Sequence, residues 1–513
     1  MNAYLIGIDV GTSGVKSELY TADGICIASR TVEYPMYQPQ NGWAESSCED
    51  WWRAVTESLQ VIFAALPEDG TVAGIGLSGQ MHSLVLLDAD YRPLRNAILW
   101  CDTRSEAECR IIEDTVGKET LLRITANAAL PGFTLSKILW VKHHEPQVFS
   151  KIAHILLPKD YIRFRLTGVL ATEYSDAAGT QLLDLQKRKW SQELTDAFEI
   201  DLAWFPTLYD SAEVTGTLTH AAAQATGLPV GTPVVGGAAD NAAAAVGTGC
   251  VRRGESFLTI GTSGVLFTHT GEAVTDPSAR CHTFCSAVKG EYYMMGVTQA
   301  AGLSLQWLSR QLFPQLRTEA LEAGENIYAY LDRLAAASPL GANRLLYLPY
   351  LMGERTPYLD GELRGMLFGL SAIHTQADII RAVLEGVAFS QRNCLSVLRE
   401  NGLEPTDIRI CGGGAKSPIW RQIFADVLGK SLSYSPKDAG GAVSGVAILA
   451  GVGTGIYADV YKGCAAFARP LSIQENDFTR SASYEKLYSI FHALYGQIAD
   501  LSHRLFHESI DIF

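Results

Sequence analysis

The sequence predicts an α/β protein of at least two domains. Its 513 residues exceed what one hydrophobic core usually organises. The pentapeptide GTSGV occurs twice, at residues 11–15 and 261–265, and each copy lies between two apolar, strand-like runs. Strand-like runs and helical patterns are interleaved in both halves of the chain. We therefore expect two α/β halves, each opening on a β-hairpin.

The first half opens with the strand-like runs YLIGIDV, VKSELYTA and GICIASRTVEY. The turn signal Asp23-Gly24 joins the last two, which predicts an antiparallel meander. Ser46 and Glu49 have the spacing of a capping box, so we expect a helix to follow them. The apolar face expected for this helix carries Trp52, Val55, Leu59 and Ile62. A further strand, VAGIGLSG, comes next.

The second half repeats this opening, with a hairpin around Gly261 and a strand at YYMMGV. Helical runs then alternate with the strand-like segments DIRICGGG and LSYSP. Apolar residues from Leu487 to Leu505 keep helical spacing, which predicts a closing helix packed on the second domain. The Gly-rich stretch at 246–256 is the expected boundary and hinge. It divides the chain into domains 1–248 and 249–513.

Composition excludes several classes of function. The net charge of −14 and the lack of a Lys/Arg-rich block argue against nucleic acid as a partner. No segment has 18 uninterrupted apolar residues and the N-terminal segment does not resemble a secretion signal, so we expect no membrane association. Ten scattered cysteines are typical of free thiols in a reducing compartment. These features favour a cytoplasmic protein that binds small molecules.

The GTSG turns have the chemistry of phosphate-binding loops. Glycines let the backbone approach a ligand closely, and several N–H groups and two hydroxyls can then converge on it. Asp9 precedes the first turn, whereas Thr259 has the equivalent place in the second. A carboxylate beside a phosphate requires a cation between them, so the sequence predicts Mg²⁺ near Asp9. A purely structural turn is the alternative interpretation.

Three other glycine-containing segments resemble nucleotide-binding motifs to different degrees. GIGLSG at 74–79 matches GxGxxG but leads into a strand-like run, so it does not indicate a dinucleotide site. Gly429-Lys430-Ser431 resembles the end of a P-loop, but Phe424 stands where the first glycine belongs. In IRICGGGAKSPIW, a strand and a glycine turn precede Ser417 and Pro418, placed as N-cap and first helical residue. This last segment is the predicted nucleotide-contacting edge.

Asp240 is an isolated acid in PVVGGAADNAAAAVG, where a buried strand runs into small residues. The carboxylate is placed to cap the Ala-rich helix that follows. It is equally placed, at a strand end beside an interdomain boundary, to accept a proton from a bound alcohol. Spacing alone leaves both interpretations open.

Eleven segments in order resemble the FGGY carbohydrate kinases over nearly the whole chain. They are IDVGTSGVK, GLSGQMH, ILWCDTRS, GFTLSKILWV, LLPKDYIRFRLTG, SDAAGT, GGAADN, TIGTSGV, YLMGERTPYLD, LEGVAF and CGGGAKSPIWRQIFAD. The resemblance implies two actin-like, ribonuclease H-like domains with a cleft between them. Sugar would bind mainly on the first domain and ATP mainly on the second. The GQMH segment is similar to that of family members that phosphorylate D-xylulose to D-xylulose 5-phosphate.

The resemblance also implies residue roles. Asp240 matches the catalytic base and Asp9 the residue near Mg²⁺. Expected sugar contacts are Met81, His82, Asn241, Trp43 and Asp102. Expected contacts to ATP are Thr12, Ser13, Gly261, Thr262, Gly413, Gly414 and Ala415. The chain departs from common family forms in the alanines before Asp240 and in Cys101, both near the expected sugar.

Other functions stay open from sequence. Gluconate, ribulose or glycerol are alternative substrates within the same family. A non-enzymatic, actin-like sugar sensor is a more distant alternative, and the intact Asp240 and both GTSG loops argue against it. The sequence does not set the oligomeric state, and a homodimer is compatible with it.

Overall fold

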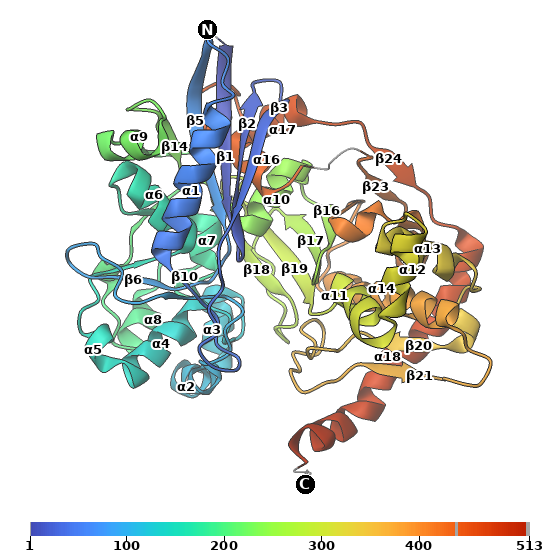
Figure 1. Ribbon diagram of the computed structural model, residues 1–513. Coiled ribbons are helices and arrows are strands. Elements are labelled where there is room, and N and C mark those ends of the chain that lie inside the picture. Colours follow the sequence, from blue (N-terminus) through green and yellow to red (C-terminus); the bar gives the residue numbers. More distant parts are fainter. Residues whose placement is uncertain (1, 437–439, 509–513) are drawn as a thin grey trace.

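The computed structural model describes residues 2–436 and 440–508. The N-terminal half forms a seven-stranded mixed sheet (Figure 1). Its strands, in spatial order, are β13 (Val214–Thr217), β14 (Pro233–Val235), β5 (Gly70–Gly79), β1 (Asn2–Val10), β2 (Gly14–Thr21) and β3 (Cys26–Glu33), with β15 (Ala238–Ala239) also paired to β5. β1, β2 and β3 are antiparallel neighbours, which confirms the predicted meander. β1 and β15 both run parallel to β5.

The second half forms another seven-stranded sheet. Its strands, in spatial order, are β18 (His282–Cys285), β19 (Tyr292–Thr298), β17 (Gly264–Thr270), β16 (Glu255–Ile260), β22 (Asp407–Cys411), β23 (Leu432–Tyr434) and β24 (Ser472–Gln474). β16 and β17 form the predicted hairpin. β16 also has a parallel neighbour, β22, as β1 has β5. The repeated pentapeptide therefore marks a repeated arrangement of strands.

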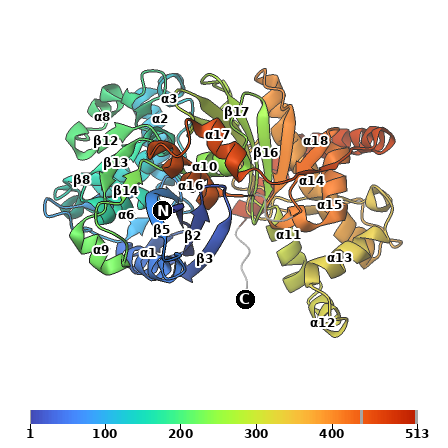
Figure 2. The same ribbon diagram turned by 90° about the horizontal axis from the view of Figure 1, so that it is seen from above.

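Helices cover both faces of the first sheet. α1 (Cys48–Phe63) packs on β2 and β3, and α16 (Ala442–Gly453) packs on β1 and β5 from the other side (Figure 2). The approach of α16 is close: a Cβ added at Gly7 would lie 2.0 Å from the carbonyl oxygen of Val443, and one at Gly76 would lie 2.0 Å from that of Val446. Glycine at these strand positions is therefore required for the packing.

The chain thus returns to the first sheet after building most of the second. α16 also packs against α10 (Asp240–Thr248), and α17 (Val460–Phe467) packs on both helices. In Figures 1 and 2 these C-terminal helices lie beside the N-terminal strands. The division of the chain at residue 248 stays a prediction.

The start of α1 differs from expectation. Ser47, not Ser46, is the N-cap residue, and its side chain makes no capping hydrogen bond. Ser46 instead belongs to β4 (Glu45–Ser46), where it pairs with Ala97 of β7 (Ala97–Ile98). The predicted capping box is therefore wrong, because Ser46 is held in the strand pair of β4 with β7.

The second sheet and the helices around it form the second lobe, and the first sheet with its helices forms the first lobe. Helices of the second lobe pack around α14 (Gln376–Glu400) and α15 (Pro418–Leu428), and α18 (Phe478–His507) packs against both. The predicted closing helix is α18, and Phe491 and Leu494 are buried as expected. Leu501 and Leu505 are 59% and 68% exposed, which contradicts the expected continuous apolar contact. The reason is visible in Figure 1, where the end of α18 projects beyond the lobe.

The remaining helices have at most 11 residues, and the remaining strands form two-stranded sheets. The other helices are α2 (Glu106–Val116), α3 (Lys118–Thr125), α4 (Thr134–His144), α5 (Pro146–Phe149), α6 (Pro158–Thr167), α7 (Tyr174–Ala178), α8 (Gln192–Ala197), α9 (His220–Thr226), α11 (Gly302–Trp307), α12 (Gln315–Glu322) and α13 (Ile327–Ala336). The small strand pairs are β6 (Val85–Leu87) with β8 (His154–Leu156), β9 (Ala171–Glu173) with β12 (Thr207–Tyr209), β10 (Leu183–Asp184) with β11 (Lys189–Trp190), and β20 (Leu346–Leu348) with β21 (Met366–Phe368). Among the described helices, none has both the length and the apolar character needed to cross a membrane.

Candidate active site

Three strands of the first sheet end at one place. Val10 of β1 and Ala239 of β15 both pair with Gly79, the last residue of β5. All three strands are parallel, so their carboxyl ends meet at one edge of the sheet. This edge brings together Asp9, the segment 80–82 and Asp240, which lie far apart in the sequence and are each predicted site residues.

Asp240 is the first residue of α10. Ala239 occupies the N-cap position, and no side chain caps this end of the helix. The Asp240 Oδ1 accepts hydrogen bonds from the backbone N–H of Asn241 (2.7 Å) and from its Nδ2 (2.9 Å). Burial, with a smaller contribution from the charge of Asp9, raises the pKa of Asp240 to about 7. Such a carboxylate is suited to accept a proton near neutral pH.

Asp9 supplies a second buried carboxylate at the same edge. Burial raises its pKa, and its Oδ1 has no hydrogen-bond partner in the part of the chain that the structure describes. An unpaired buried carboxylate oxygen is a suitable ligand for a hard cation. The described residues contain no group of three His, Cys, Asp or Glu side chains placed to hold a metal ion. A Mg²⁺ ion here would therefore take most of its ligands from phosphate and water.

The first GTSG turn is fixed through its carbonyl groups. The Gly11 N–H donates to the Gly14 oxygen (3.0 Å), and the Gly11 oxygen accepts from Gln80 Nε2 (3.1 Å) and from the Tyr34 hydroxyl. The amides of Thr12 and Ser13 donate to no atom within residues 2–436 and 440–508. These two N–H groups are available to an anion.

The second GTSG turn is fixed by the start of α11. The oxygen of Gly261 accepts from the N–H of Gly302 (2.8 Å), and that of Thr262 accepts from the N–H of Ala301 (2.9 Å). The amides of Thr262 and Ser263, like their counterparts, have no acceptor among the described residues. Both copies of the pentapeptide thus present unpaired amides.

The third glycine segment lies against the second turn. Gly412 has a φ of +83°, and a Cβ there would lie 2.7 Å from the Ile260 oxygen. A Cβ on Gly414 would lie 2.3 Å from Ile260 Cγ2. Ile260 directly precedes Gly261, so Gly413, Gly414 and Ala415 lie beside the second turn. Ser417 caps α15 by accepting from the Trp420 N–H (3.1 Å), as predicted.

Met81 and His82 follow β5 and face side chains of the second sheet. The Met81 sulfur accepts from the Tyr293 hydroxyl (3.9 Å), and the His82 ring lies 5.6 Å from that of Phe284. His82 Nδ1 is 2.7 Å from the Gly179 oxygen, so it carries the proton and donates. Burial lowers the pKa of His82 well below its usual value. The neutral ring therefore offers Nε2 as an acceptor for a ligand hydroxyl.

Trp43 and Asp102 are held by the same arginine. The Arg104 guanidinium lies 3.7 Å from the centre of the Trp43 ring and 2.7 Å from Asp102 Oδ2. Oδ2 also accepts from the Ala44 N–H (2.6 Å), and Oδ1 accepts from the Arg104 N–H (2.9 Å). Both carboxylate oxygens of Asp102 thus have partners within the protein. Sugar contacts by Trp43 and Asp102 stay predictions.

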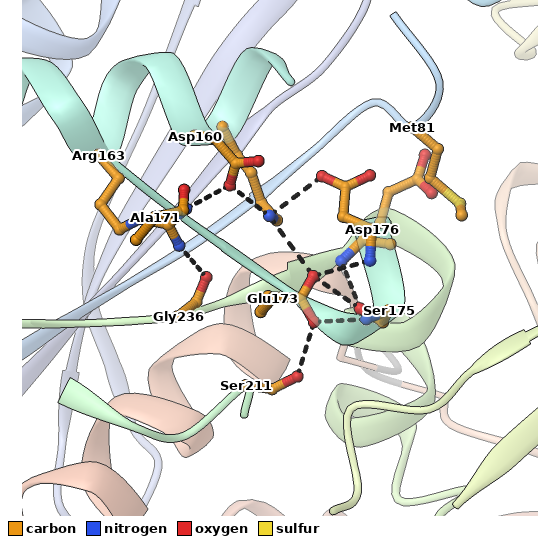
Figure 3. Close-up of polar contacts among 12 residues, drawn as sticks. Met81, Asp160, Arg163, Ala171, Glu173, Ser175, Asp176, Ser211 and Gly236 are labelled. Atoms are coloured by element: carbon orange, nitrogen blue, oxygen red, sulfur yellow. Dashed lines mark hydrogen bonds and ion pairs between the residues drawn. The ribbon is translucent and has the colours of Figure 1, made fainter. Parts of the chain in front are cut away.

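A buried ionic network that the sequence analysis missed supports the strand before Asp240 (Figure 3). Lys159 Nζ lies 2.7 Å from Asp160, 3.4 Å from Glu173 and 3.1 Å from Asp176. Glu173 accepts from the Ser175 hydroxyl (2.9 Å), which itself accepts from the Ala239 N–H (3.0 Å). The only sequence signal was the presence of charged residues within the apolar runs LLPKDYI and ATEYSDAAGT.

Comparison with known proteins agrees with this geometry. Residues 4–247 match the N-terminal domain, and residues 257–454 the C-terminal domain, of the FGGY family of carbohydrate kinases. The xylulose kinase of Bacillus subtilis (strain 168) is 39% identical over 500 residues, covering 97% of this chain and 98% of that protein.

Solved structures give the same result. The ligand-bound xylulose kinase of Lactobacillus acidophilus superposes with a TM-score of 0.90 at 30% identity, covering 97% of this chain and 98% of that one. The gluconate kinase of the same organism has a TM-score of 0.90 at 29% identity, covering 97% and 99%. The predicted two-domain, actin-like architecture is confirmed. The chain belongs to the FGGY family of carbohydrate kinases.

Proposed function

We propose that this kinase transfers the γ-phosphoryl group of ATP to the 5-hydroxyl of D-xylulose, giving D-xylulose 5-phosphate and ADP. The observation that carries the proposal is the edge of the first sheet, where Asp240, Asp9 and His82 converge at the ends of three parallel strands. The names of the relatives with full-length similarity support xylulose as the sugar. So does the QMH segment at 80–82.

In this mechanism Asp240 acts as the general base. Phosphoryl transfer passes through a loose transition state, so the protein mainly positions the reactants and offsets charge. Asp240 orients the sugar hydroxyl and takes its proton as the new oxygen–phosphorus bond forms. The bond between the γ-phosphorus and the bridging oxygen breaks, and its electron pair leaves with ADP. The pKa of about 7 allows Asp240 to accept that proton near neutral pH.

The unpaired amides of the glycine turns would hold the phosphates. Thr12 and Ser13 serve the reacting phosphoryl group, Gly261 and Thr262 the other phosphates, and the segment 413–415 the nucleoside side. Mg²⁺ near Asp9 would neutralise phosphate charge when bound. The fit rests on the unpaired Oδ1 of Asp9, which is buried where phosphate oxygens would otherwise meet a bare carboxylate.

His82 and Met81 would shape the sugar site. Because His82 Nδ1 donates to Gly179, its Nε2 accepts a hydrogen bond from a sugar hydroxyl. Asn241 Nδ2 donates to Asp240 (2.9 Å), and the Asn241 amide oxygen accepts no hydrogen bond from the described residues, so we expect it to accept one from a sugar hydroxyl. These groups orient the sugar without supplying charge to the reaction.

The proposal is tested by measuring ADP release with Mg²⁺-ATP and a panel of D-xylulose, gluconate, ribulose, glycerol and fuculose. We expect the highest kcat/KM with D-xylulose, and phosphorus NMR of the product should show a phosphate ester at C5. A clear preference for gluconate or glycerol would overturn the xylulose assignment and leave the kinase assignment intact. No sugar-dependent ADP release with any of the five would contradict the kinase itself.

A further inference from the structure

Arg355 lies in the loop between β20 and β21 of the second lobe, and the backbone around it is fixed. The N–H of Thr356 donates to the Val297 oxygen (3.0 Å), and the Thr356 hydroxyl accepts from the Val297 N–H (3.1 Å). The same hydroxyl donates to the Arg280 oxygen (2.7 Å). Arg355 therefore lies on a segment that the backbone and hydroxyl of Thr356 anchor to Val297 of β19.

The neighbouring acid, Glu354, forms no ion pair with the guanidinium of Arg355. Glu354 is buried, and its Oε1 accepts from the backbone N–H groups of Gln299 and Arg355 (2.9 Å each). Its Oε2 accepts from the Ser390 hydroxyl (2.9 Å). The Glu354 carboxylate is thus used to fix the loop.

The guanidinium of Arg355 instead reaches the first lobe. Its central carbon lies 5.9 Å from the centre of the Trp100 ring, and its Nη2 is 3.9 Å from where a Cβ would stand on Gly132. Trp100 in turn donates from Nε1 to the Thr12 hydroxyl (2.9 Å), in the first phosphate turn. Gly132 lies just before α4, whose Thr134 donates to the His82 oxygen (3.0 Å). Arg355 therefore lies among the residues that surround Met81 and His82.

Within the described residues, the guanidinium has no carboxylate at ion-pair distance and donates no hydrogen bond. It is half-buried. By contrast, the buried Arg104 pairs with Asp102 at 2.7 Å and with Glu45 at 2.8 Å. The nearby Lys137 donates to backbone oxygens, including those of His82 and Phe133 (3.2 Å each). The unpaired guanidinium nitrogens of Arg355 reach solvent, so their N–H donors are available to a bound ligand.

We propose that Arg355 is a sugar-binding residue supplied by the second lobe, donating hydrogen bonds to oxygens of the substrate other than the reacting hydroxyl. This inference rests on the proposed sugar kinase function. The guanidinium is planar, carries five N–H donors and has no acceptor, which matches adjacent oxygen atoms of a ketose. Asp240 has no ion pair with Arg355, so the guanidinium leaves the base free to act.

The central experiment compares Arg355→Met with Arg364→Met. Arg364 is an exposed arginine of the same loop, and among the described residues its side chain contacts loop carbonyls and Phe506. For Arg355→Met we expect the KM for D-xylulose to rise about 10- to 100-fold, as for loss of charged hydrogen bonds, with little change in the KM for ATP. Arg355→Lys should recover part of the loss. Arg364→Met should behave like the wild type.

Melting temperature separates sugar binding from a structural role. Because Arg355 has no partner within the protein, Arg355→Met should melt at or above the wild-type temperature without ligand. Saturating D-xylulose should raise the melting temperature of the wild type and of Arg364→Met, and raise that of Arg355→Met much less. A lowered melting temperature without ligand, or an unchanged sugar-induced shift, would overturn the proposal.

Failure of the inference and failure of the proposed function give different results. If the wild type phosphorylates D-xylulose and Arg355→Met keeps its KM within about twofold, only the inference fails. If the wild type prefers gluconate, the xylulose assignment fails, and the same comparison is made with gluconate. Loss of the gluconate-induced melting shift would then uphold Arg355 as a contact to the substrate, and its retention would overturn it.

Discussion

The two GTSGV turns have the same sequence and equivalent places in their sheets, but the residues that precede them differ in charge. Asp9 stands two residues before the first turn and pairs with Ser78 of the neighbouring strand β5. Thr259 has the same place before the second turn and pairs with Cys411 of the neighbouring strand β22. The Thr259 hydroxyl lies 3.1 Å from the Cys411 sulfur, so this position is neutral. One turn therefore has a buried acid behind it, and the other does not.

This difference predicts different tasks for the two turns. A phosphate can bind the neutral second turn through amides alone, whereas the first turn requires a cation between Asp9 and any phosphate. Asp240 lies near Asp9, whose charge contributes to its raised pKa. We infer that the first turn serves the reacting phosphoryl group and the second the remaining phosphates. The predictions below test this division.

The largest effect is expected for Asp240→Asn. Asn has nearly the same size and can keep the contacts to Asn241, but it cannot accept the hydroxyl proton. Loss of a positioned general base typically costs about 10²- to 10⁴-fold in rate, so we expect kcat to fall at least about a hundredfold. Purified protein with saturating Mg²⁺-ATP and sugar is required for the measurement. Activity within a factor of a few of the wild type would remove Asp240 as the base.

Stability provides the control for that variant. The folded pKa of Asp240, about 7, lies above its ordinary value, so the folded state binds the proton more tightly. Its contribution to the free energy of unfolding is present at low pH and is lost as the pH rises through about 7. Asn is always neutral, so Asp240→Asn should melt at or above the wild-type temperature at pH 8. A large drop would mean that the lost activity reflects misfolding.

A direct comparison of the turns is Asp9→Asn against Thr259→Val. Asp9→Asn removes the charge expected to hold Mg²⁺, and we expect kcat to fall about 10- to 100-fold with a higher Mg²⁺ concentration at half-maximal activity. Thr259→Val removes only a hydroxyl, and we expect kcat within about twofold of the wild type. Equal effects of the two substitutions would contradict the division of tasks.

The pH profile sharpens the same comparison. The base form of Asp240 is lost as the pH falls below about 7, so kcat/KM for the sugar should decline about tenfold per pH unit on that side. Asp9→Asn removes a charge that raises the pKa of Asp240, so the midpoint of its residual activity should move to lower pH. The midpoint of Thr259→Val should match the wild type. A profile that stays flat from pH 5 to 8 would exclude Asp240 as the titrating group.

Local signals in the sequence predicted much of the fold and of the first-lobe site. Hairpins, the strand before Asp240 and the Ser417 cap depend on neighbouring residues, and the structure confirms each. The capping box failed because Ser46 pairs with a strand about fifty residues away. Sequence periodicity cannot identify such partners.

Contacts between the lobes were beyond the reach of the sequence for the same reason. Tyr293 lies in a strand-like run and Arg355 in the segment YLMGERTPYLD, and neither pattern tells which residues of the first lobe they meet; the fold brings them to Met81 and Trp100. The segment of α16 is apolar on all sides, which indicates burial but not the sheet that buries it. α16 packs on β1 and β5 because the glycines on those strands, far away in the sequence, leave room for its backbone.

The smallest expected effect concerns the glycine that ends each turn, tested by Gly14→Ala and Gly264→Ala. A Cβ on Gly14 would lie 3.0 Å from the Val32 oxygen, whereas one on Gly264 would lie 2.2 Å from Gln391 Nε2. Gln391 Nε2 donates to the Thr298 hydroxyl (2.7 Å) in the buried core of the second lobe. Neither glycine has a left-handed backbone, so the substitutions differ only in the space they need.

We therefore expect Gly264→Ala to lower the free energy of unfolding by about 1–3 kcal/mol through overpacking and displacement of the Gln391 amide. Gly14→Ala should lower it by less, since a small shift of the exposed edge strand β3 relieves its contact. Thermal melting of both variants without ligand, beside the wild type, gives the comparison. A larger loss for Gly14→Ala would mean that the first turn, not the second, is the more rigidly packed. Both variants keep the amides of residues 12–13 and 262–263. Any rise in the KM for ATP should therefore parallel the loss of stability, and it should be greater for Gly264→Ala.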